Sequence, residues 1–324
     1  MYTVCDQNTT PLCVSATAHI LVLRDMTLQL RVYLEGALID NGGQKASDNR
    51  PLMRDNLRNS PFNGANYIPV KDPYSFATTN IDVTSKFTHV GPGLLPRHQE
   101  IIDSAAVFNI TGQNAIVDWV FVELRSKSNF RTVIATRSGL LQRDGDIVDI
   151  NGVSPLAFSG VLVDSCYVVI RHRNHLGVMS QKVSTRTLVD FTKNSQPVFD
   201  YGTSLNNGYD YTGLALKDDV VYGYRAMWAG DFDANGKIKF VNPGDDQNVL
   251  FFDVFAYPTN VMNTSNYNFT YGYFQGDFDM NAKSKYDNPN DDKNYLFSQL
   301  LLHPLNIGLL SNFNFVIEQV PSGL

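Results

Sequence analysis

Hydrophobic and polar residues alternate along much of the chain. Residues 27–35 carry leucine or valine at every second position, from Leu28 to Leu34. The same alternation marks three further segments, 118–125, 166–171 and 313–317. A period of two is typical of strands that pack one face on a core and turn the other to solvent. Turn signals such as Asn-Gly and Asp-Gly interrupt these segments often, so the pattern predicts a mainly β protein whose middle, residues 26–210, is an antiparallel β-sandwich.

The first residues of the chain form a separate pattern. In residues 1–25, two short strand-like runs flank a polar loop. They are predicted to be the last hairpin of an upstream domain, with an edge hairpin of the main sandwich as the alternative. Cys5 and Cys13 are spaced to close this loop by a disulfide in an oxidising compartment, whereas Cys166 lies in an alternating run that favours a small buried side chain. The chain begins without the charged and apolar regions of a signal peptide, which predicts a mature fragment of a longer secreted protein.

An internal repeat dominates the last third of the chain. The sequence GDFDANGKIKF at 230–240 returns 46 residues later as GDFDMNAKSKY at 276–286. Beyond it, NPGDD at 242–246 matches NPNDD at 288–292 at the same offset. Because chance does not produce so long a match, residues 211–310 are predicted to hold two copies of one structural unit.

Each copy begins like a calcium-binding loop. Calcium takes about six to eight oxygen ligands, and carboxylates at alternate positions of a tight loop converge on one point together with a backbone carbonyl. In the first loop the predicted ligands are the side chains of Asp231, Asp233, Asn235 and Asp246 and the carbonyl oxygen of Lys237. The acidic residue that usually stands at the twelfth position is missing, because Asn242 occupies it. We therefore expect a lengthened loop that returns the carboxylate of Asp246 at the sixteenth position.

The second loop departs from this pattern at its turn. Its predicted ligands are the side chains of Asp277, Asp279, Asn281 and Asp292 and the carbonyl oxygen of Lys283. Ala282 replaces the turn glycine, and an alanine with a positive φ carries strain of roughly 1 kcal/mol. Short helices are expected over 248–255 and 294–302, and a final strand in 311–324 is expected to return to the sandwich. The alternative is a pair of Asx-rich turns that bind no metal, and magnesium suits such flexible oxygen-rich loops less well than calcium.

Three further polar clusters have simpler explanations than a metal site. Residues 144–149 are acidic, but strand alternation after an Asp-Gly turn accounts for them. His172 and His175 would face opposite sides of a strand unless the chain turns at Asn174, so a polar strand end bonded to neighbouring loops is expected. The cluster around Arg54 predicts an ion-pair network that fixes a long loop.

Composition and charge narrow the range of functions. Of the 324 residues, 43% are hydrophobic and 18% are charged, which excludes a disordered chain. The net charge of −6 favours neither nucleic acid nor an anionic membrane surface as a partner. No apolar run approaches the about 18 residues that a membrane span needs. Catalytic signatures such as Gly-x-Ser-x-Gly and His-Glu-x-x-His are absent from the sequence, so no enzyme is expected.

Several long motifs carry a resemblance to a known family. They are LRVYLEG at 30–36, LMRDNLR at 52–58, VDWVFVELR at 117–125, LQRDGDIVD at 141–149 and RHRNHLG at 171–177. With them, residues 26–324 resemble a C-terminal module of large secreted, adhesin-like (haemagglutinin-like) surface proteins of gliding and marine Bacteroidota. The paired loops are similar to dockerin-type calcium repeats, and YTVCD at 2–6 resembles the end of a bacterial immunoglobulin-like repeat.

This resemblance implies export by the type IX route and an extracellular, cell-surface role, including assembly into an appendage such as a filament or hook. The first hypothesis is therefore a non-catalytic structural and adhesive module stiffened by Ca²⁺. Its expected partners are further copies of itself in a homo-oligomer, other surface-protein subunits or a cell-surface glycan. The aromatic side chains proposed to be exposed for adhesion are Tyr257, Tyr267, Tyr271, Tyr273 and Phe274.

Two alternatives stay open at this point. The first is a carbohydrate-binding module of a secreted protein, which would use Trp228, because Trp119 lies in a predicted core strand. The second is docking to a cohesin-like partner through the paired loops. Docking requires an exposed helix face, and the predicted helices are rich in Phe and Leu, which favours their burial instead.

Overall fold

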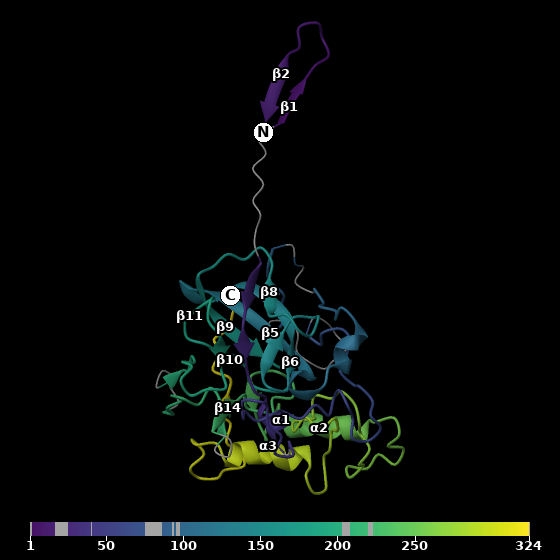
Figure 1. Cartoon of the computed structure of the whole chain (residues 1–324). Helices are drawn as coiled ribbons and strands as arrows, with labels where there is room; N and C mark the ends of the chain where they lie inside the picture. The colour runs from purple at the N-terminus through teal and green to yellow at the C-terminus, as the bar shows by residue number, and fades with distance from the viewer. Residues whose placement is uncertain are drawn as a thin grey trace.

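The described part of the chain is mainly β. The computed structural model describes residues 2–16, 25–39, 41–74, 86–92, 94, 98–202, 208–219 and 223–323. Within these residues one sheet of eight strands is accompanied by four two-stranded pairs and three short α-helices. The prediction of a mainly β protein is therefore confirmed. Figure 1 shows the three helices gathered at one end of the sheet region.

The large sheet has the strand order β10-β9-β5-β6-β7-β4-β12, and β11 also pairs with β9. Its strands are β4 (Leu30–Arg31), β5 (Ile116–Ser126), β6 (Asn129–Gln142), β7 (Asp146–Val148), β9 (Ser165–Arg171), β10 (Val178–Met179), β11 (Val183–Ser184) and β12 (Val189–Asp190). All neighbours pair antiparallel except β4 and β12, which run parallel. The sheet is thus mixed, where the alternation predicted a purely antiparallel arrangement, because period-two patterning carries no information on strand direction.

The remaining elements are small. The two-stranded pairs are β1 (Tyr2–Cys5) with β2 (Cys13–Ala16), β3 (Met26–Leu28) with β8 (Leu156–Phe158), β13 (Lys217–Asp219) with β14 (Tyr224–Ala226), and β15 (Lys237–Ile238) with β16 (Val316–Ile317). The helices are α1 (Glu35–Leu38), α2 (Asp246–Phe255) and α3 (Asp292–Leu301), together with the 3-10 turns η1 (Ala105–Asn109) and η2 (Gly112–Asn114).

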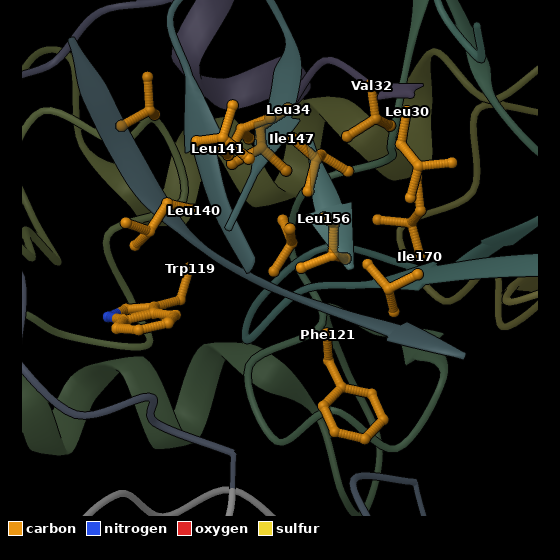
Figure 2. Close-up of a cluster of buried hydrophobic side chains, with 14 of the residues drawn as sticks. Leu30, Val32, Leu34, Trp119, Phe121, Leu140, Leu141, Ile147, Leu156 and Ile170 are labelled. Atoms are coloured by element: carbon orange, nitrogen blue, oxygen red, sulfur yellow. The ribbon is translucent and has the colours of Figure 1, made fainter. Parts of the chain in front are cut away.

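The main core covers both faces of the central strand β5. Trp119 and Phe121 point to one side of this strand, and Ile147 and Leu156 gather on the other (Figure 2). The prediction that such strands turn one face to solvent is wrong here, since every residue of β5 up to Arg125 is buried. Other parts of the chain cover the second face: the hydroxyl of Tyr74 donates to the carbonyl oxygen of Trp119 (2.8 Å), and Phe87 packs edge-on against Phe121.

The N-terminal hairpin is closed on itself. Strands β1 and β2 pair in register, and the disulfide joins Cys5 to Cys13. Cys166 is a free, buried thiol, as predicted. Residues 17–24, which connect the hairpin to β3, lie outside the described residues.

The two repeats share a second core. Helices α2 and α3 begin two residues before the predicted helices, and α3 also ends one residue before its predicted end. They contact each other at the end of the molecule opposite β8 (Figure 1). The core between them contains Phe232, Ile238, Leu250, Phe278, Leu296, Leu300, Leu176, Trp228, Phe313 and Val316. A final strand is present as β16, but it does not return to the large sheet as predicted, because its hydrogen-bonded partner is β15 in the first repeat.

None of the helices in the described ranges is both long and apolar enough to cross a bilayer.

Candidate metal centres

The first loop brings three carboxylates together. Oxygen atoms of Asp231, Asp233 and Asp246 lie within 4.8 Å of one another. Asp246 reaches this position because it is the first residue of α2, and two backbone N–H groups hold its side chain: Phe232 donates to Oδ1 (2.7 Å) and Lys239 donates to Oδ2 (2.8 Å). The structure therefore places Asp246, the sixteenth residue of the loop, beside the two early aspartates.

The N-cap of α2 explains this placement. Asp245 accepts a hydrogen bond from the backbone N–H of Asn248 (2.8 Å) and so starts the helix one residue before Asp246. Asn242, which stands at the twelfth position, has a positive φ of 85° and forms part of the exposed turn before the helix. This turn accounts for the residues by which the loop is longer than a usual calcium loop, whose acidic ligand stands at the twelfth position.

The second loop repeats the same geometry. Oxygen atoms of Asp277, Asp279 and Asp292 also lie within 4.8 Å of one another. The backbone N–H of Phe278 donates to Asp292 Oδ1 (2.8 Å), and that of Lys285 donates to its Oδ2 (2.8 Å). These bonds match those of the first loop atom for atom.

The turn residues behave as their positions require. The backbone N–H of Gly236 donates to Asp231 Oδ2 (2.9 Å), and that of Ala282 donates to Asp277 Oδ2 (2.9 Å). Both residues have a positive φ, 85° at Gly236 and 69° at Ala282. The predicted left-handed alanine is thus present, and the second loop tolerates its strain to keep this bond.

Burial makes both clusters electrostatically unfavourable when all of their carboxylates are ionised. Burial is the main cause that raises the pKa of Asp231 to about 7, and Glu318 and Asp233 raise it further. The pKa values of Asp246, Asp277 and Asp292 are raised well above the ordinary value, again chiefly by burial and then by the neighbouring aspartates. A bound cation would relieve both effects, because it offsets the mutual repulsion and replaces the lost hydration.

The donor set fits a hard cation. Asp231 Oδ1 and Asn281 Oδ1 are buried and accept no hydrogen bond, so each is an oxygen whose lone pairs are unused. All predicted ligands are oxygen atoms, which suits calcium rather than a soft transition metal. Asn235 and Asn281 donate through Nδ2 to Asp233 and Asp279 (2.8 Å each), which leaves their amide oxygens as the ligand atoms. The carbonyl oxygens of Lys237 and Lys283 stay predicted ligands, since the carboxylate clusters do not involve them.

Two basic side chains from the sheet region lie beside the loops, and the sequence did not reveal them. Lys86 Nζ is 3.7 Å from Asp231 Oδ2. Arg54 Nη1 is 3.5 Å from Asp279 Oδ2. The sequence predicted a local ion-pair network around Arg54. Asp55 and Arg58 do form an ion pair there, but Arg54 pairs with Asp279 of the second loop. No local pattern marks Lys86.

The end of β9 docks both loops on the large sheet. The backbone oxygen of Asn174 accepts from the N–H groups of Gly230 (3.0 Å) and Asp231 (3.2 Å). Its side-chain Nδ2 donates to the carbonyl oxygens of Gln275 (2.8 Å) and Asp277 (2.9 Å). This buried asparagine therefore touches both repeats, which agrees with the predicted polar strand end bonded to neighbouring loops.

The other polar clusters singled out in the sequence form hydrogen bonds and ion pairs. The chain bends after Arg171, so Nδ1 of His172 and Nδ1 of His175 come within 3.1 Å, and His172 Nε2 is 3.1 Å from Asp118. Within residues 144–149, Asp146 pairs with Arg31 (2.6 Å) and Asp149 pairs with Arg137 (2.8 Å). These side chains hold the sheet together through ion pairs.

Four of the five predicted exposed aromatic residues form one cluster. It contains Tyr257, Tyr267, Tyr271 and Phe274, with Phe62 and Phe269 added by the fold. The ring of Phe62 stacks on that of Tyr271 with centroids 4.5 Å apart. Tyr273 lies apart from this cluster, and its hydroxyl donates to Asp118 Oδ1 (2.6 Å). All five residues are half-buried, where the sequence predicted exposed side chains. Both tryptophans, Trp119 and Trp228, are buried in the cores.

The fold and these sites define a mainly β protein with a pair of matched, carboxylate-lined loops. The chain matches no protein-family model, no curated protein and no solved structure. The resemblance to adhesin-like surface proteins therefore rests on the sequence motifs alone, and what it implies belongs to the proposal below.

Proposed function

We propose that this chain is a non-catalytic structural and adhesive module of an extracellular cell-surface or appendage protein, with a β-sandwich body stiffened by calcium in two loops. The observation that carries the proposal is the matched pair of three-carboxylate clusters, each held by the same backbone bonds. A single acidic turn is common without a metal. Two loops with the same carboxylate geometry are expected when each of them binds the same kind of ion.

Calcium would act here as a structural element. Three buried carboxylates repel one another until a cation binds, so binding free energy becomes folding free energy for the segment that contains them. That segment includes α2, α3 and their shared core, and β15 connects it to the C-terminal strand. A stiffened segment of this kind suits a protein that transmits force between a cell and a surface.

The test is thermal unfolding of the full chain in excess calcium and then in a chelator. Calcium at a hundred times its dissociation constant should stabilise the fold by about 2.7 kcal/mol per independent site, a rise of several degrees in Tm. Asp233→Asn and Asp279→Asn should each remove one part of this rise. Asp103→Asn, which changes an exposed carboxylate outside the loops, is the matched control and should leave the rise unchanged. Equal Tm values with calcium and with chelator would reduce both loops to metal-free turns.

Self-assembly or binding to other surface-protein subunits would use apolar side chains left exposed beside the repeats. In equivalent turns after α2 and α3, Val261 is 82% exposed and Ile307 is 92% exposed. Light scattering in the same two buffers separates the possibilities. An oligomer that appears with calcium favours appendage assembly, and a monomer in both favours a module that binds a different subunit.

A carbohydrate-binding module is the second candidate, and the exposed aromatic cluster favours it. Phe62 is 56% exposed and Phe269 is 53% exposed, and flat aromatic faces stack well on sugar rings. Trp228 cannot serve, because it is buried. Binding on a glycan array that is lost in Phe62→Ala and Phe269→Ala, with unchanged Tm, would favour this function over the structural one.

A further inference from the structure

We propose that Lys86 and Arg54 are built-in counter-cations of the two loops, and that the greater positive charge around the second loop makes it bind Ca²⁺ after the first. This inference rests on the proposed function, since it concerns the order in which the same two loops take up calcium. It assigns a role to two side chains that lie outside the repeats and that no calcium-loop pattern contains.

The positive charge beside the first loop is largely offset. Lys86 lies 3.7 Å from Asp231 Oδ2, but its shorter contact, 2.9 Å, is with Glu318 Oε2. Glu318 is buried and brings a second negative charge close to the loop. The ammonium group of Lys86 is thus shared between two carboxylates, so the first loop keeps most of its attraction for a divalent cation.

The second loop faces a less compensated charge. Arg54 forms an ion pair with the loop residue Asp279, at 3.5 Å, and another nitrogen of the same guanidinium donates to the carbonyl oxygen of Ile39. Arg54 Nε is buried and has no hydrogen-bond partner, and within the described ranges no second carboxylate pairs with this guanidinium. The side chain is only 8% exposed, so water screens its charge weakly.

A second guanidinium adds to this charge. Arg173 pairs with Asp118 (2.9 Å), donates to the carbonyl oxygen of Phe274, which lies just before the second loop, and contacts Met280 Sδ within that loop (3.4 Å). A divalent ion entering the second loop therefore meets the guanidinium of Arg54 and, close by, that of Arg173, whose charge Asp118 partly offsets. The first loop presents one ammonium that Glu318 shares. Coulomb repulsion from fixed positive charge weakens cation binding, and the effect is larger in a buried site.

The same side chains have an opposite effect on the calcium-free protein. With no calcium bound, Arg54 and Lys86 each offset one carboxylate of their loop and stabilise the fold. Removal of either side chain should therefore destabilise the calcium-free protein and at the same time tighten calcium binding. A purely structural role predicts a loss of stability in both states and no gain in affinity, so the two readouts separate the explanations.

The experiment is calorimetric titration of the chelator-treated full chain with calcium chloride at fixed pH and ionic strength. The wild type should show two steps, of which Asp233→Asn removes the tighter and Asp279→Asn the weaker. Arg54→Met should tighten the weaker step by roughly fivefold or more and lower the Tm in chelator. Arg54→Lys, which keeps the charge, is the matched control and should leave the step close to that of the wild type.

Glu318→Gln provides a second variant with the opposite sign. It frees Lys86 to pair with Asp231 alone, so the tighter step should weaken by several fold while the weaker step stays unchanged. Two steps that Arg54→Met and Glu318→Gln leave unmoved, or a weaker step assigned to the first loop, would overturn this inference and leave the proposed function intact. No calcium binding by the wild type would overturn both.

Discussion

Glu318 is the residue on which the C-terminal segment, the large sheet and the first loop converge. It forms ion pairs with Arg171 of β9 and with Lys86 (2.9 Å), and Oε2 also accepts from the backbone N–H of Gly177 (3.0 Å). Burial alone would raise the pKa of this carboxyl, but Arg171 and then Lys86 lower it to about 2. The ionised side chain is therefore part of the folded structure at neutral pH.

The resulting pH dependence can be measured by acid unfolding in chelator. Because the folded pKa of about 2 lies below the ordinary value of 4.5, the stabilisation by Glu318 is complete above about pH 4.5 and is lost as the pH falls towards 2. Glu318→Gln should cost roughly 3 kcal/mol at pH 7, since it removes one buried carboxylate partner of Arg171 and the nearer partner of Lys86, which keeps only its longer contact with Asp231. The difference between variant and wild type should shrink through this acid range, and Asp103→Asn, a change at an exposed carboxyl away from these ion pairs, should show no such trend. A constant difference down to pH 2 would contradict the assignment.

Among the secondary-structure elements, α1 is short but fixes the position of the second loop. The backbone N–H of Gly36 lies 3.4 Å from His175 Nε2, and the backbone of Phe278 passes directly over this glycine. A methyl group at Gly36 would stand 1.8 Å from the carbonyl oxygen of Phe278. Glu35 adds a contact with α3 by accepting from Gln299 Nε2 (3.0 Å). The helix and the loop approach so closely only because position 36 has no side chain.

Gly36→Ala should accordingly displace the second loop. We expect a loss of stability of about 3 kcal/mol, at the upper end for overpacking, since the obstacle is backbone and cannot rotate away. Chemical denaturation measures this loss, and the weaker calcium step should be impaired more than the tighter one. Gly308→Ala is the control, because that glycine is exposed and only the flexible side chain of Leu310 is near it. Equal stability of the two variants would show that the contact is not tight.

At the scale of the whole molecule, the repeats and the large sheet form one connected structure. Asn174 binds both loops, β16 pairs with β15, and Arg125 of β5 donates to the carbonyl oxygen of Pro321 (2.6 Å). The residues predicted as separate segments at 26–210, 211–310 and 311–324 are therefore tied together by buried hydrogen bonds. Calcium in the loops is expected to act beyond the loops themselves.

Hydrogen exchange with and without calcium tests this coupling. Protection should rise in α2 and α3 and also in β9 and β5, because the sheet ends at the residues that hold the loops. The hairpin at 2–16, which is closed by its own disulfide, is the internal reference and should not change. A rise confined to 230–255 and 276–301 would mean that the repeats form an independent unit.

The local features of this protein could be predicted from its sequence. Period-two alternation located β5 and β9, and the 46-residue repeat located both loops. The helices that follow the loops were also expected, although α2 and α3 begin two residues earlier than predicted. The carboxylate at the sixteenth position and the left-handed Ala282 were also predictable. Each of these features depends on turn chemistry, helix capping or side-chain period, which act over a few neighbouring residues.

Tertiary structure decided what lies against these local features. Alternation in β5 could not show that its second face would be covered, because Tyr74 and Phe87 come from distant parts of the chain. The same holds for the hydrogen bond of Tyr273 to Asp118 and the pairing of β16 with β15. Arg54 and Lys86 carry no local signal, since a long side chain pairs with whichever carboxylate the fold brings near. The sequence by itself thus determined the elements and the acidic loops, and only the fold decided which faces are buried and which charges surround each loop.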